Sequence, residues 1–190
     1  TIPGDIDEDQ VWVIVKRTIN GATKRYVEYL SGFDFGTDVG NAFFVDSGLT
    51  YSGSAATTIS GLNHLEGQSV AILADGAAHA NKTVSSGAIT LDRSVTKAQI
   101  GLPFTSKLET LRIDAGSAMG SSQGKNKRIG EVTVRLFRTV GLKIGTSSTE
   151  LDTIPFRSSS DSMDTALTLF TGDKTAEFNG GYDDDATITI

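Results

Sequence analysis

The stretch that decides the fold is residues 11–30, VWVIVKRTINGATKRYVEYL. It opens with a run of β-branched and aromatic residues, 11–15, which is typical of a β-strand. Asn20-Gly21 follows, and this dipeptide favours a two-residue turn because both positions tolerate a positive φ. A second apolar-rich run, residues 26–30, completes the return arm. The sequence therefore predicts one antiparallel β-hairpin.

Counting back from the turn gives the cross-strand partners in this hairpin. Three pairs join large apolar side chains: Val15–Tyr26, Ile14–Val27 and Trp12–Tyr29. Successive pairs fall on opposite faces of the ribbon, so both faces carry apolar side chains. We therefore expect both faces to be covered, as they are inside a sandwich or an assembly.

Nearer the turn, like charges oppose each other in two cross-strand pairs: Lys16–Arg25 and Arg17–Lys24. Like charges directly opposite one another destabilise a ribbon. Four cations at one tip indicate a surface that meets an acidic partner, although a solvated tip accounts for them equally well.

The composition limits the class of protein. With 190 residues, the chain can form one β domain or two small ones, burying about 70% of the unfolded surface. It has no cysteine, which excludes disulfides and thiolate metal sites. No run approaches the ~20 apolar residues of a membrane-spanning helix, so membrane insertion is not expected. The chain opens at Thr1 and stops at Ile190 inside an alternating run, and we expect it to be a piece of a longer polypeptide.

The net charge of −6 is spread unevenly along the chain. Residues 105–140 carry seven cations against three acids, so this segment is basic and the remainder is strongly acidic. Such a chain can dock head to tail with copies of itself. Ordinary surface charge is the alternative.

Strand signals recur along the chain, separated by Gly, Ser, Asn and Asp, and no amphipathic helix pattern stands out. We predict an all-β fold, an antiparallel sandwich with an inserted small β-barrel. Residues 1–60 and 104–190 supply the sandwich, and the short strands of residues 61–103 form the barrel. Two sequential domains are the alternative. Residues 115–126, rich in Gly, Ser and Asn, are expected to form a long loop.

One motif suggests nucleophilic catalysis. Residues 120–124, GSSQG, match the nucleophile-elbow pattern G-x-S-x-G around Ser122. That motif requires a helix after the serine, and an acid and a histidine later in the chain. Here a β-alternating run follows, and both histidines lie upstream. We therefore expect a loop without catalysis and assign no catalytic residue.

Other candidate ligand groups are weaker still. Lys125, Lys127 and Arg128 could contact phosphate, but the phosphate-loop pattern fails at both ends and no aromatics are interleaved with the cations. His64 and His79 lack the spacing of a zinc site and are expected to be turn or surface residues.

Two acidic clusters could in principle bind calcium: Asp5, Asp7, Glu8 and Asp9, and Asp183, Asp184 and Asp185. Neither has the spacing of a calcium loop, and acidic turns are commoner. The sequence therefore predicts no metal site and no cofactor-binding site.

Several strings of this chain together resemble bacteriophage tail structural proteins. They are residues 12–21 (WVIVKRTING), 25–28 (RYVE), 61–70 (GLNHLEGQSV), 73–76 (LADG), 101–104 (GLPF), 127–137 (KRIGEVTVRLF) and 155–159 (PFRSS). The family looks like the tail nozzle, or tubular, proteins of short-tailed phages and prophages. Its inserted barrel is similar to the small β domain called FCCH in ubiquitin-activating enzymes, a likeness of fold that implies no ubiquitin chemistry.

The resemblance implies the C-terminal part of a subunit that is made in the bacterial cytoplasm and ends in the virion tail. Such subunits form homo-oligomeric rings, often of six, around a channel through which DNA leaves, so non-specific contact with DNA is implied as well. They also contact other tail proteins. The resemblance implies no catalytic residues.

The expected function is therefore that of a non-enzymatic structural component of a phage or prophage tail. A carbohydrate- or receptor-binding β-sandwich module is the alternative, and it would need a cluster of exposed aromatic side chains. A hydrolase that acts through strand-borne carboxylates or Ser122 is the third possibility.

Overall fold

The structure of the chain is a computed structural model that describes residues 2–3, 9–114, 120–163 and 165–190. Regular structure in this part of the chain is almost entirely β-strand, and the strands pair antiparallel. The helices are single turns of 3₁₀ helix, η1 (Val39–Asn41) and η2 (Asn63–Leu65). The predicted all-β, antiparallel class is confirmed. The chain divides into two compact units, unit 1 (Thr1–Phe104) and unit 2 (Thr105–Ile190).

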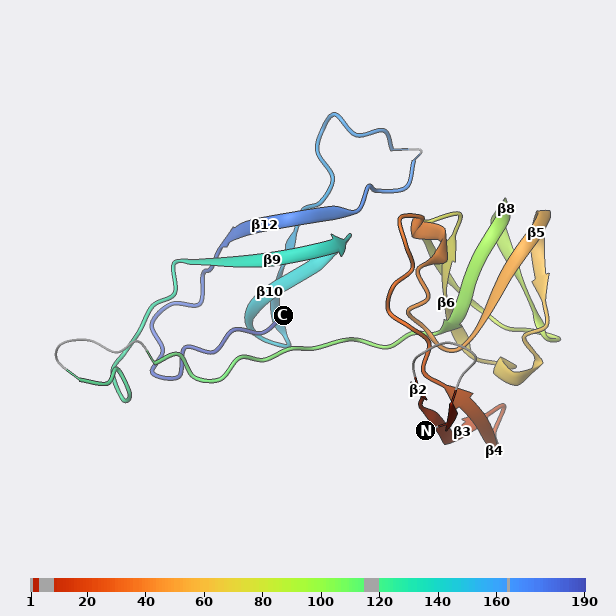
Figure 1. Cartoon of the computed structure of the whole chain (residues 1–190), viewed down its shortest axis with the longest axis horizontal. Coiled ribbons are helices and arrows are strands. Elements are labelled where there is room, and N and C mark those ends of the chain that lie inside the picture. The colour runs from red at the N-terminus through yellow and green to blue at the C-terminus, as the bar shows by residue number, and fades with distance from the viewer. Residues whose placement is uncertain (1, 4–8, 115–119, 164) are drawn as a thin grey trace. The chain divides into compact units, whose positions relative to one another are not determined.

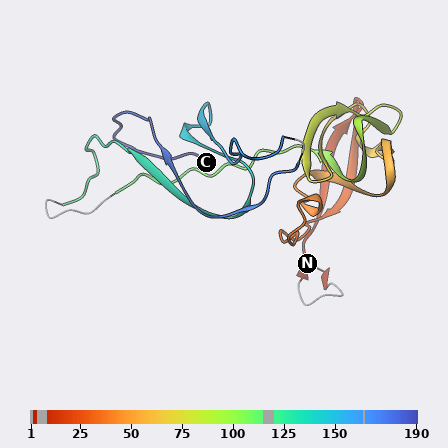
Figure 2. The same cartoon turned by 90° about the horizontal axis from the view of Figure 1, so that it is seen from above.

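Unit 1 is built around a four-stranded sheet. Its strands are β5 (Asp46–Ser60), β6 (Ser69–Ala74), β7 (Ala77–Thr83) and β8 (Ala88–Leu102). They lie in the order β5-β8-β6-β7, and Figure 1 shows β5 and β8 side by side. Register shifts interrupt the β5–β8 ladder at three places, and Figure 2 shows the sheet strongly bent. Such bulges increase local twist and allow one sheet to fold over its own core.

The core of unit 1 consists of apolar side chains that point inward from the bent sheet. Its fully or nearly fully buried members are Ile59, Leu62, Leu65, Val70, Ile72, Ala74, Val84, Ile89, Leu91, Val95, Ala98 and Ile100. Along β6 the buried side chains alternate with partly exposed ones, as expected for a strand with one covered face. Tight turns with positive φ connect the strands, including Asp75-Gly76 between β6 and β7.

Two features of the predicted organisation differ in the structure. Residues 46–60, assigned to the sandwich, form β5, which pairs with β8 inside the four-stranded sheet. The chain therefore divides sequentially near residue 104, and residues 61–103 are not an insertion with a core of their own. In addition, the predicted barrel is an open sheet, because within the described residues no strand pair joins the outer strands β5 and β7.

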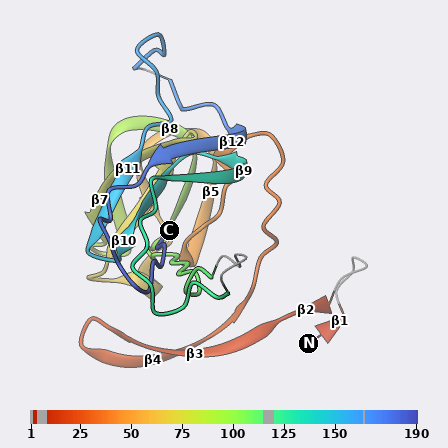
Figure 3. The same cartoon turned by 90° about the vertical axis from the view of Figure 1, so that its left-hand side faces the viewer.

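The hairpin of unit 1 consists of β3 (Trp12–Ile19) and β4 (Ala22–Tyr29), which Figure 3 shows as a long, gently bent ribbon. Every predicted cross-strand pair is confirmed, including the two pairs of like charges. Asn20 and Gly21 have φ values of 48° and 72°, as a primed two-residue turn requires. A shorter pair of strands, β1 (Ile2–Pro3) and β2 (Asp9–Gln10), precedes the hairpin.

The turn of the hairpin is testable by substitution. Gly21→Val should lower the free energy of unfolding by about 1 kcal/mol or more, because a β-branched residue is strained at positive φ. Urea denaturation followed by circular dichroism measures this change. Gly32→Val is the matched control, since Gly32 has no left-handed φ and no atoms near its would-be Cβ. Equal stability of the two variants would contradict the turn assignment.

Unit 2 contains two two-stranded sheets. One pairs β9 (Glu131–Thr139) with β12 (Phe170–Glu177), and the other pairs β10 (Leu142–Ser147) with β11 (Glu150–Ile154). Strands β9 and β12 lie side by side in Figures 1 and 3. The two sheets share a small core centred on three buried side chains, Val132, Ile144 and Phe178.

The segment before β9, residues 105–114, has an alternating sequence pattern but forms no strand of its own. It is bound to the C-terminal end of the chain by backbone hydrogen bonds, with Leu108 and Thr110 donating to Ile190 and Ile188 at 2.8 and 2.9 Å. An isolated bridge joins Glu109 to Thr189. The alternation of residues 105–114 thus marks extended chain rather than a long strand. Of the predicted loop 115–126, residues 115–119 lie outside the described part of the chain.

Candidate functional site

The outer face of the β3–β4 hairpin is the most unusual surface of unit 1. Three cross-strand pairs share this face in a row: Trp12–Tyr29, Ile14–Val27 and Lys16–Arg25. We call these six residues the hairpin stripe. All of them are exposed, and Ile14 and Val27 are exposed by 75% and 68%. The expectation that both faces of the hairpin are covered therefore fails for this face within the chain itself.

The apolar part of the stripe is continuous. The rings of Trp12 and Tyr29 pack at a centroid distance of 5.3 Å with an interplanar angle of 42°. Next to them lies the aliphatic pair Ile14–Val27. In addition, β3 and β4 pair only with each other in the described structure, so both edges of the ribbon are open. A continuous apolar patch of this kind on a ribbon with open edges marks an interaction surface.

The opposite face of the hairpin is fixed to the rest of unit 1 by polar contacts. Arg17 forms two charge-assisted bonds with the carboxylate of Glu28, one of them 3.0 Å from Nη2 to Oε2. Ser47 Oγ donates to Glu28 Oε1 at 2.7 Å. Tyr26 donates its hydroxyl proton to the backbone carbonyl of His64 at 3.1 Å. These bonds tie the hairpin to the start of β5 and to η2, and they hold the stripe outward.

A serine, a histidine and a carboxylate meet in this junction, but not as a catalytic triad. His64 Nε2 lies 2.8 Å from the carbonyl oxygen of Ser47, so this nitrogen donates to the backbone. The hydroxyl of Ser47 is bonded to Glu28 instead. The imidazole therefore cannot accept the serine proton, as a triad requires. The junction stabilises the fold, and it places His64 in a turn as expected.

The pKa of Glu28 is held below its ordinary value of 4.5, chiefly by the hydrogen bond from Arg17. The bonds to ionised Glu28 therefore stabilise the fold fully above pH 4.5, and this contribution is lost as the pH falls through the lowered folded-state pKa. We expect Glu28→Gln to reduce the loss of stability between neutral pH and pH 3. Urea denaturation at several pH values measures it, with Asp152→Asn as the control. Parallel curves for Glu28→Gln and the wild type would contradict this role.

The cations of unit 1 fall into two groups. Beyond Arg17, three of them form ion pairs with carboxylates of the same unit: Lys82–Asp92 at 2.6 Å, Arg93–Asp75 at 3.5 Å and Lys97–Asp38 at 3.2 Å. The side chains of Lys16, Lys24 and Arg25 have no ion pair or hydrogen bond in the described part of unit 1. The predicted tip of four cations is thus a tip of three, because Arg17 turns inward to Glu28.

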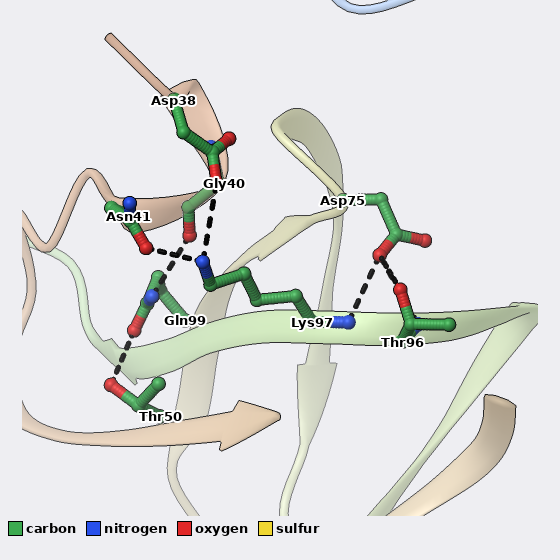
Figure 4. Close-up of polar contacts among 8 residues, drawn as sticks. All are labelled: Asp38, Gly40, Asn41, Thr50, Asp75, Thr96, Lys97 and Gln99. Atoms are coloured by element: carbon green, nitrogen blue, oxygen red, sulfur yellow. Dashed lines mark hydrogen bonds and ion pairs between the residues drawn. The ribbon is translucent and has the colours of Figure 1, made fainter. Parts of the chain in front are cut away.

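A second polar cluster lies on β8 and is drawn in Figure 4. The Lys97 ammonium group contacts Asp38 Oδ2 and Asn41 Oδ1, which lie at the two ends of η1. Gln99 Nε2 donates to the carbonyl oxygen of Gly40 at 2.9 Å, and the buried Gln99 amide accepts from Thr50 at 2.6 Å. The polar groups of this cluster satisfy one another and fasten η1 to the sheet.

The same strand also holds the β6–β7 turn. Asp75 Oδ1 accepts from the backbone N–H of Thr96 at 3.1 Å, from its hydroxyl at 3.1 Å and from the N–H of Lys97 at 2.9 Å (Figure 4). Burial opposes ionisation of Asp75, yet these donors hold its pKa below the ordinary value. The carboxylate therefore fastens the β6–β7 turn to β8.

The nucleophile-elbow motif lies in a loop of unit 2. Ser122 donates its hydroxyl proton to Asp114 Oδ1 at 2.8 Å, and its backbone N–H donates to the same oxygen at 2.9 Å. These bonds, together with one from Ser121, lower the pKa of Asp114. No histidine occurs in residues 105–190. Asp114 thus organises the loop around Ser122, and a β-strand follows at residue 131 instead of a helix.

Three of the seven cations in the basic segment of residues 105–140 form ion pairs within unit 2. Its ion pairs are Lys107–Glu109 at 2.9 Å, Arg112–Asp185 at 2.8 Å and Arg135–Asp173 at 2.7 Å. Lys127 donates to the carbonyl oxygen of Asp184 at 2.8 Å. The three candidate phosphate-binding residues therefore do not form one free basic patch, since Lys127 is engaged while Lys125 and Arg128 remain exposed.

The C-terminal acidic cluster also has local partners. Asp183 accepts from the backbone N–H groups of Asp185 and Ala186 at 3.3 and 3.0 Å, which lower its pKa. Asp185 pairs with Arg112. These carboxylates close a turn, in agreement with the commoner interpretation. Of the N-terminal cluster, Asp5, Asp7 and Glu8 lie outside the described residues, and only the backbone of Asp9 is described.

His79 is also bound locally. Its Nδ1 donates to the carbonyl oxygen of Ala80 at 2.7 Å, and its Nε2 accepts from the N–H of Asp92 at 3.2 Å. Both ring nitrogens are therefore occupied by the backbone. Across the described residues, no three histidine, aspartate or glutamate side chains converge as a metal site would require.

A shallow hollow of about 350 Å³ lies in unit 2 beside the β10–β11 turn. It is lined by backbone and side chains that include Glu150, Asp152 and Phe178. This volume is at the lower end of the range for ligand sites, and the lining lacks the apolar majority that such sites show. The hollow is therefore a weaker candidate than the hairpin stripe.

Comparison of the chain with protein-family models and with curated proteins finds no match. The described residues include no helix that is long and apolar enough to cross a membrane.

Proposed function

We propose that the chain is a non-enzymatic structural module of a phage or prophage virion tail, which assembles with copies of itself and with other tail proteins. The observation that carries the proposal is the hairpin stripe, an exposed apolar ribbon face that ends in two cations, neither of which has an ion pair with the described residues. The resemblance of the sequence to tail nozzle proteins supports the same assignment and the virion location.

The hairpin stripe is exposed on a ribbon whose other face is held in place. Every large side chain on this face contacts solvent, although its inner face is anchored by a network of hydrogen bonds. Covering Ile14 and Val27 would gain about 25 cal/mol for each Å² removed from water. The cations Lys16 and Arg25 would gain counterions if the covering surface were acidic. The net charge of −6 makes a copy of the chain a suitable source of acids.

Self-association tests the proposal. We expect the wild-type chain to associate in a concentration-dependent manner, and the variant Ile14→Thr with Val27→Thr to stay monomeric, because the variant removes exposed apolar area and keeps β-branched residues. Sedimentation equilibrium measures this. Trp12 is the only tryptophan of the chain. A change in tryptophan fluorescence therefore shows, independently of sedimentation, whether another molecule covers the stripe.

Leu111→Thr is the matched control, since Leu111 is an apolar residue of unit 2 that is even more exposed than Ile14 and Val27. We expect this variant to associate like the wild type, with circular dichroism verifying that all variants are folded. A wild-type chain that is monomeric up to millimolar concentration would overturn the proposal, as would association of the stripe variant equal to that of the wild type.

A carbohydrate- or receptor-binding module is the second candidate, and the exposed pair Trp12–Tyr29 favours it. Its two rings are tilted by 42°, and aliphatic side chains continue the surface, so the flat platform that stacks on a sugar ring is not formed. Saturable changes in Trp12 fluorescence on adding bacterial surface glycans, without self-association, would favour this second function over assembly.

A further inference from the structure

The β9–β12 ribbon of unit 2 has an outer face that is exposed along its length. Three cross-strand pairs occupy it: Glu131–Glu177, Thr133–Thr175 and Arg135–Asp173. We call these six residues the ribbon face. The alternate residues of β9, such as Val132 and Leu136, point inward to the core of unit 2 and are buried. The ribbon is thus covered on one side and open on the other, as the hairpin is.

Two of the three pairs on the ribbon face are satisfied internally. The hydroxyls of Thr133 and Thr175 lie 2.8 Å apart, within hydrogen-bond distance. Arg135 binds Asp173 through two parallel bonds of 2.7 and 2.9 Å, the strongest geometry for such a pair. These contacts fix the register of the ribbon and leave its end pair as the exception.

The end pair places Glu131 directly opposite Glu177. Neither carboxylate has an ion pair or a side-chain hydrogen bond in the described part of the chain. Like charges directly opposed on a ribbon are destabilising. The hairpin stripe contains the counterpart of opposite sign, because Lys16 directly opposes Arg25 and neither has an ion pair or side-chain hydrogen bond among the described residues.

From this pair of observations we infer that the hairpin stripe of one copy docks face to face on the ribbon face of a second copy. Lys16 and Arg25 then lie over Glu131 and Glu177, and each like-charged pair supplies the counterions of the other. This inference rests on the proposed function and names the surface that receives the stripe. The contact joins two different surfaces, so it is heterologous and can close into a ring.

The common geometry of the two ribbons extends the match beyond the charges. Side chains on one face of a strand repeat every two residues, or roughly 7 Å. The two ribbons can be aligned so that both extend in the same direction from their charged pairs. In this alignment Ile14 lies over the methyl group of Thr133, and Val27 lies over that of Thr175. Trp12 then lies over Arg135, an arrangement that favours cation–π stacking.

The size of the contact sets its expected strength. Strands β3 and β4 have eight residues each, so the shared length is at most about 27 Å. A ribbon face of this length covers less than the roughly 800 Å² per partner of a stable interface. A single contact is therefore weak, and it depends on salt because charges screen over roughly 8 Å at physiological ionic strength. In a closed ring each copy is held by two such contacts at once, so the ring is more stable than a single contact.

Charge exchange tests the inference. We expect the stripe variant Lys16→Glu with Arg25→Glu to lose self-association, and the ribbon variant Glu131→Lys with Glu177→Lys to lose it too. Mixing the two variants should restore association to near the wild-type level, because each contact in the mixture joins opposite charges. A chain with all four substitutions should associate with itself again. Each double substitution reverses both charges of a pair, so two like charges still lie opposite each other in that ribbon. The stability of each variant should therefore be close to that of the wild type.

The controls change the same charges elsewhere. Lys24→Glu lies on the other face of the hairpin, and Asp152→Lys lies on β11, so both should leave association near the wild-type level. If the stripe variant fails to associate but the ribbon variant associates fully, the ribbon face is not the surface that receives the stripe. That result would overturn this inference and leave the proposed function standing. A wild-type chain that never associates would overturn both.

Disulfide trapping gives a second, independent test. The chain has no cysteine, so a chain with Ile14→Cys and another with Thr133→Cys each carry a single thiol. Oxidation of the mixture at low salt should give a covalent dimer of the two different chains, and salt should suppress it. A thiol placed by Leu111→Cys should not be trapped with Ile14→Cys. Equal trapping at both positions would contradict the stated docking.

Discussion

Ile100→Ala should lower the free energy of unfolding of unit 1 by about 2–5 kcal/mol. Ile100 lies on β8 and is completely buried at the centre of the core, where β8 is flanked by β5 and β6. Truncation removes three methyl or methylene groups from contact with the core, and the bent sheet cannot collapse to fill the cavity. Urea denaturation followed by circular dichroism measures the loss.

The control for this substitution also tests function. Ile14→Ala deletes the same atoms from the hairpin stripe, where Ile14 is exposed by 75%. Its effect on stability should stay within about 0.5 kcal/mol, while self-association weakens. A large stability loss in Ile14→Ala, or a negligible one in Ile100→Ala, would contradict the assignment of core and docking surface.

Gly145→Ala should disrupt the β10–β11 sheet of unit 2 and cost more than about 3 kcal/mol, since overpacking against backbone cannot relax by rotamer change. A Cβ on Gly145 would overlap the carbonyl oxygen of Glu150 and lie 2.7 Å from its carbonyl carbon. Gly145 also exchanges backbone hydrogen bonds of 2.9 and 2.8 Å with Thr189. Moving its backbone therefore breaks contacts on both sides of β10.

Gly130→Ala is the matched control in the same unit. No atom lies within 4 Å of the Cβ that it would introduce, and its φ is not left-handed. We expect this variant to be as stable as the wild type or more stable by about 0.4–1 kcal/mol, because alanine restricts the unfolded chain. Thermal denaturation of both variants measures the contrast. Similar melting temperatures for Gly145→Ala and the wild type would show that the close approach at β10 is relieved cheaply.

The hairpin could be predicted from the sequence to the residue. Its register follows from a two-residue turn and from the alternation of the strands, both of which act over short distances along the chain. The location of the candidate site therefore followed from the sequence. The exposure of the stripe did not, because alternation shows which residues share a face and not whether that face is covered.

Strand β5 shows what short-range patterns miss. Its second half, within Asp46–Ser60, is made of small and polar residues with weak strand signals. It forms a strand because β8, which begins nearly thirty residues after it ends, supplies the hydrogen-bond partners. The predicted boundary at residue 60 failed for this reason, since the β5–β8 ladder crosses it.

The sequence by itself determined the all-β class, the hairpin register, the pairing of like charges at Lys16 and Arg25, and the absence of cysteine chemistry. Only the tertiary structure decided which charged side chains have a partner among the described residues. It turned Arg17 toward Glu28, and it brought Glu131 opposite Glu177 from strands more than thirty residues apart. The physical reason is that local propensity and turn geometry act between near neighbours, whereas burial and ion pairing depend on contacts between distant segments of the chain.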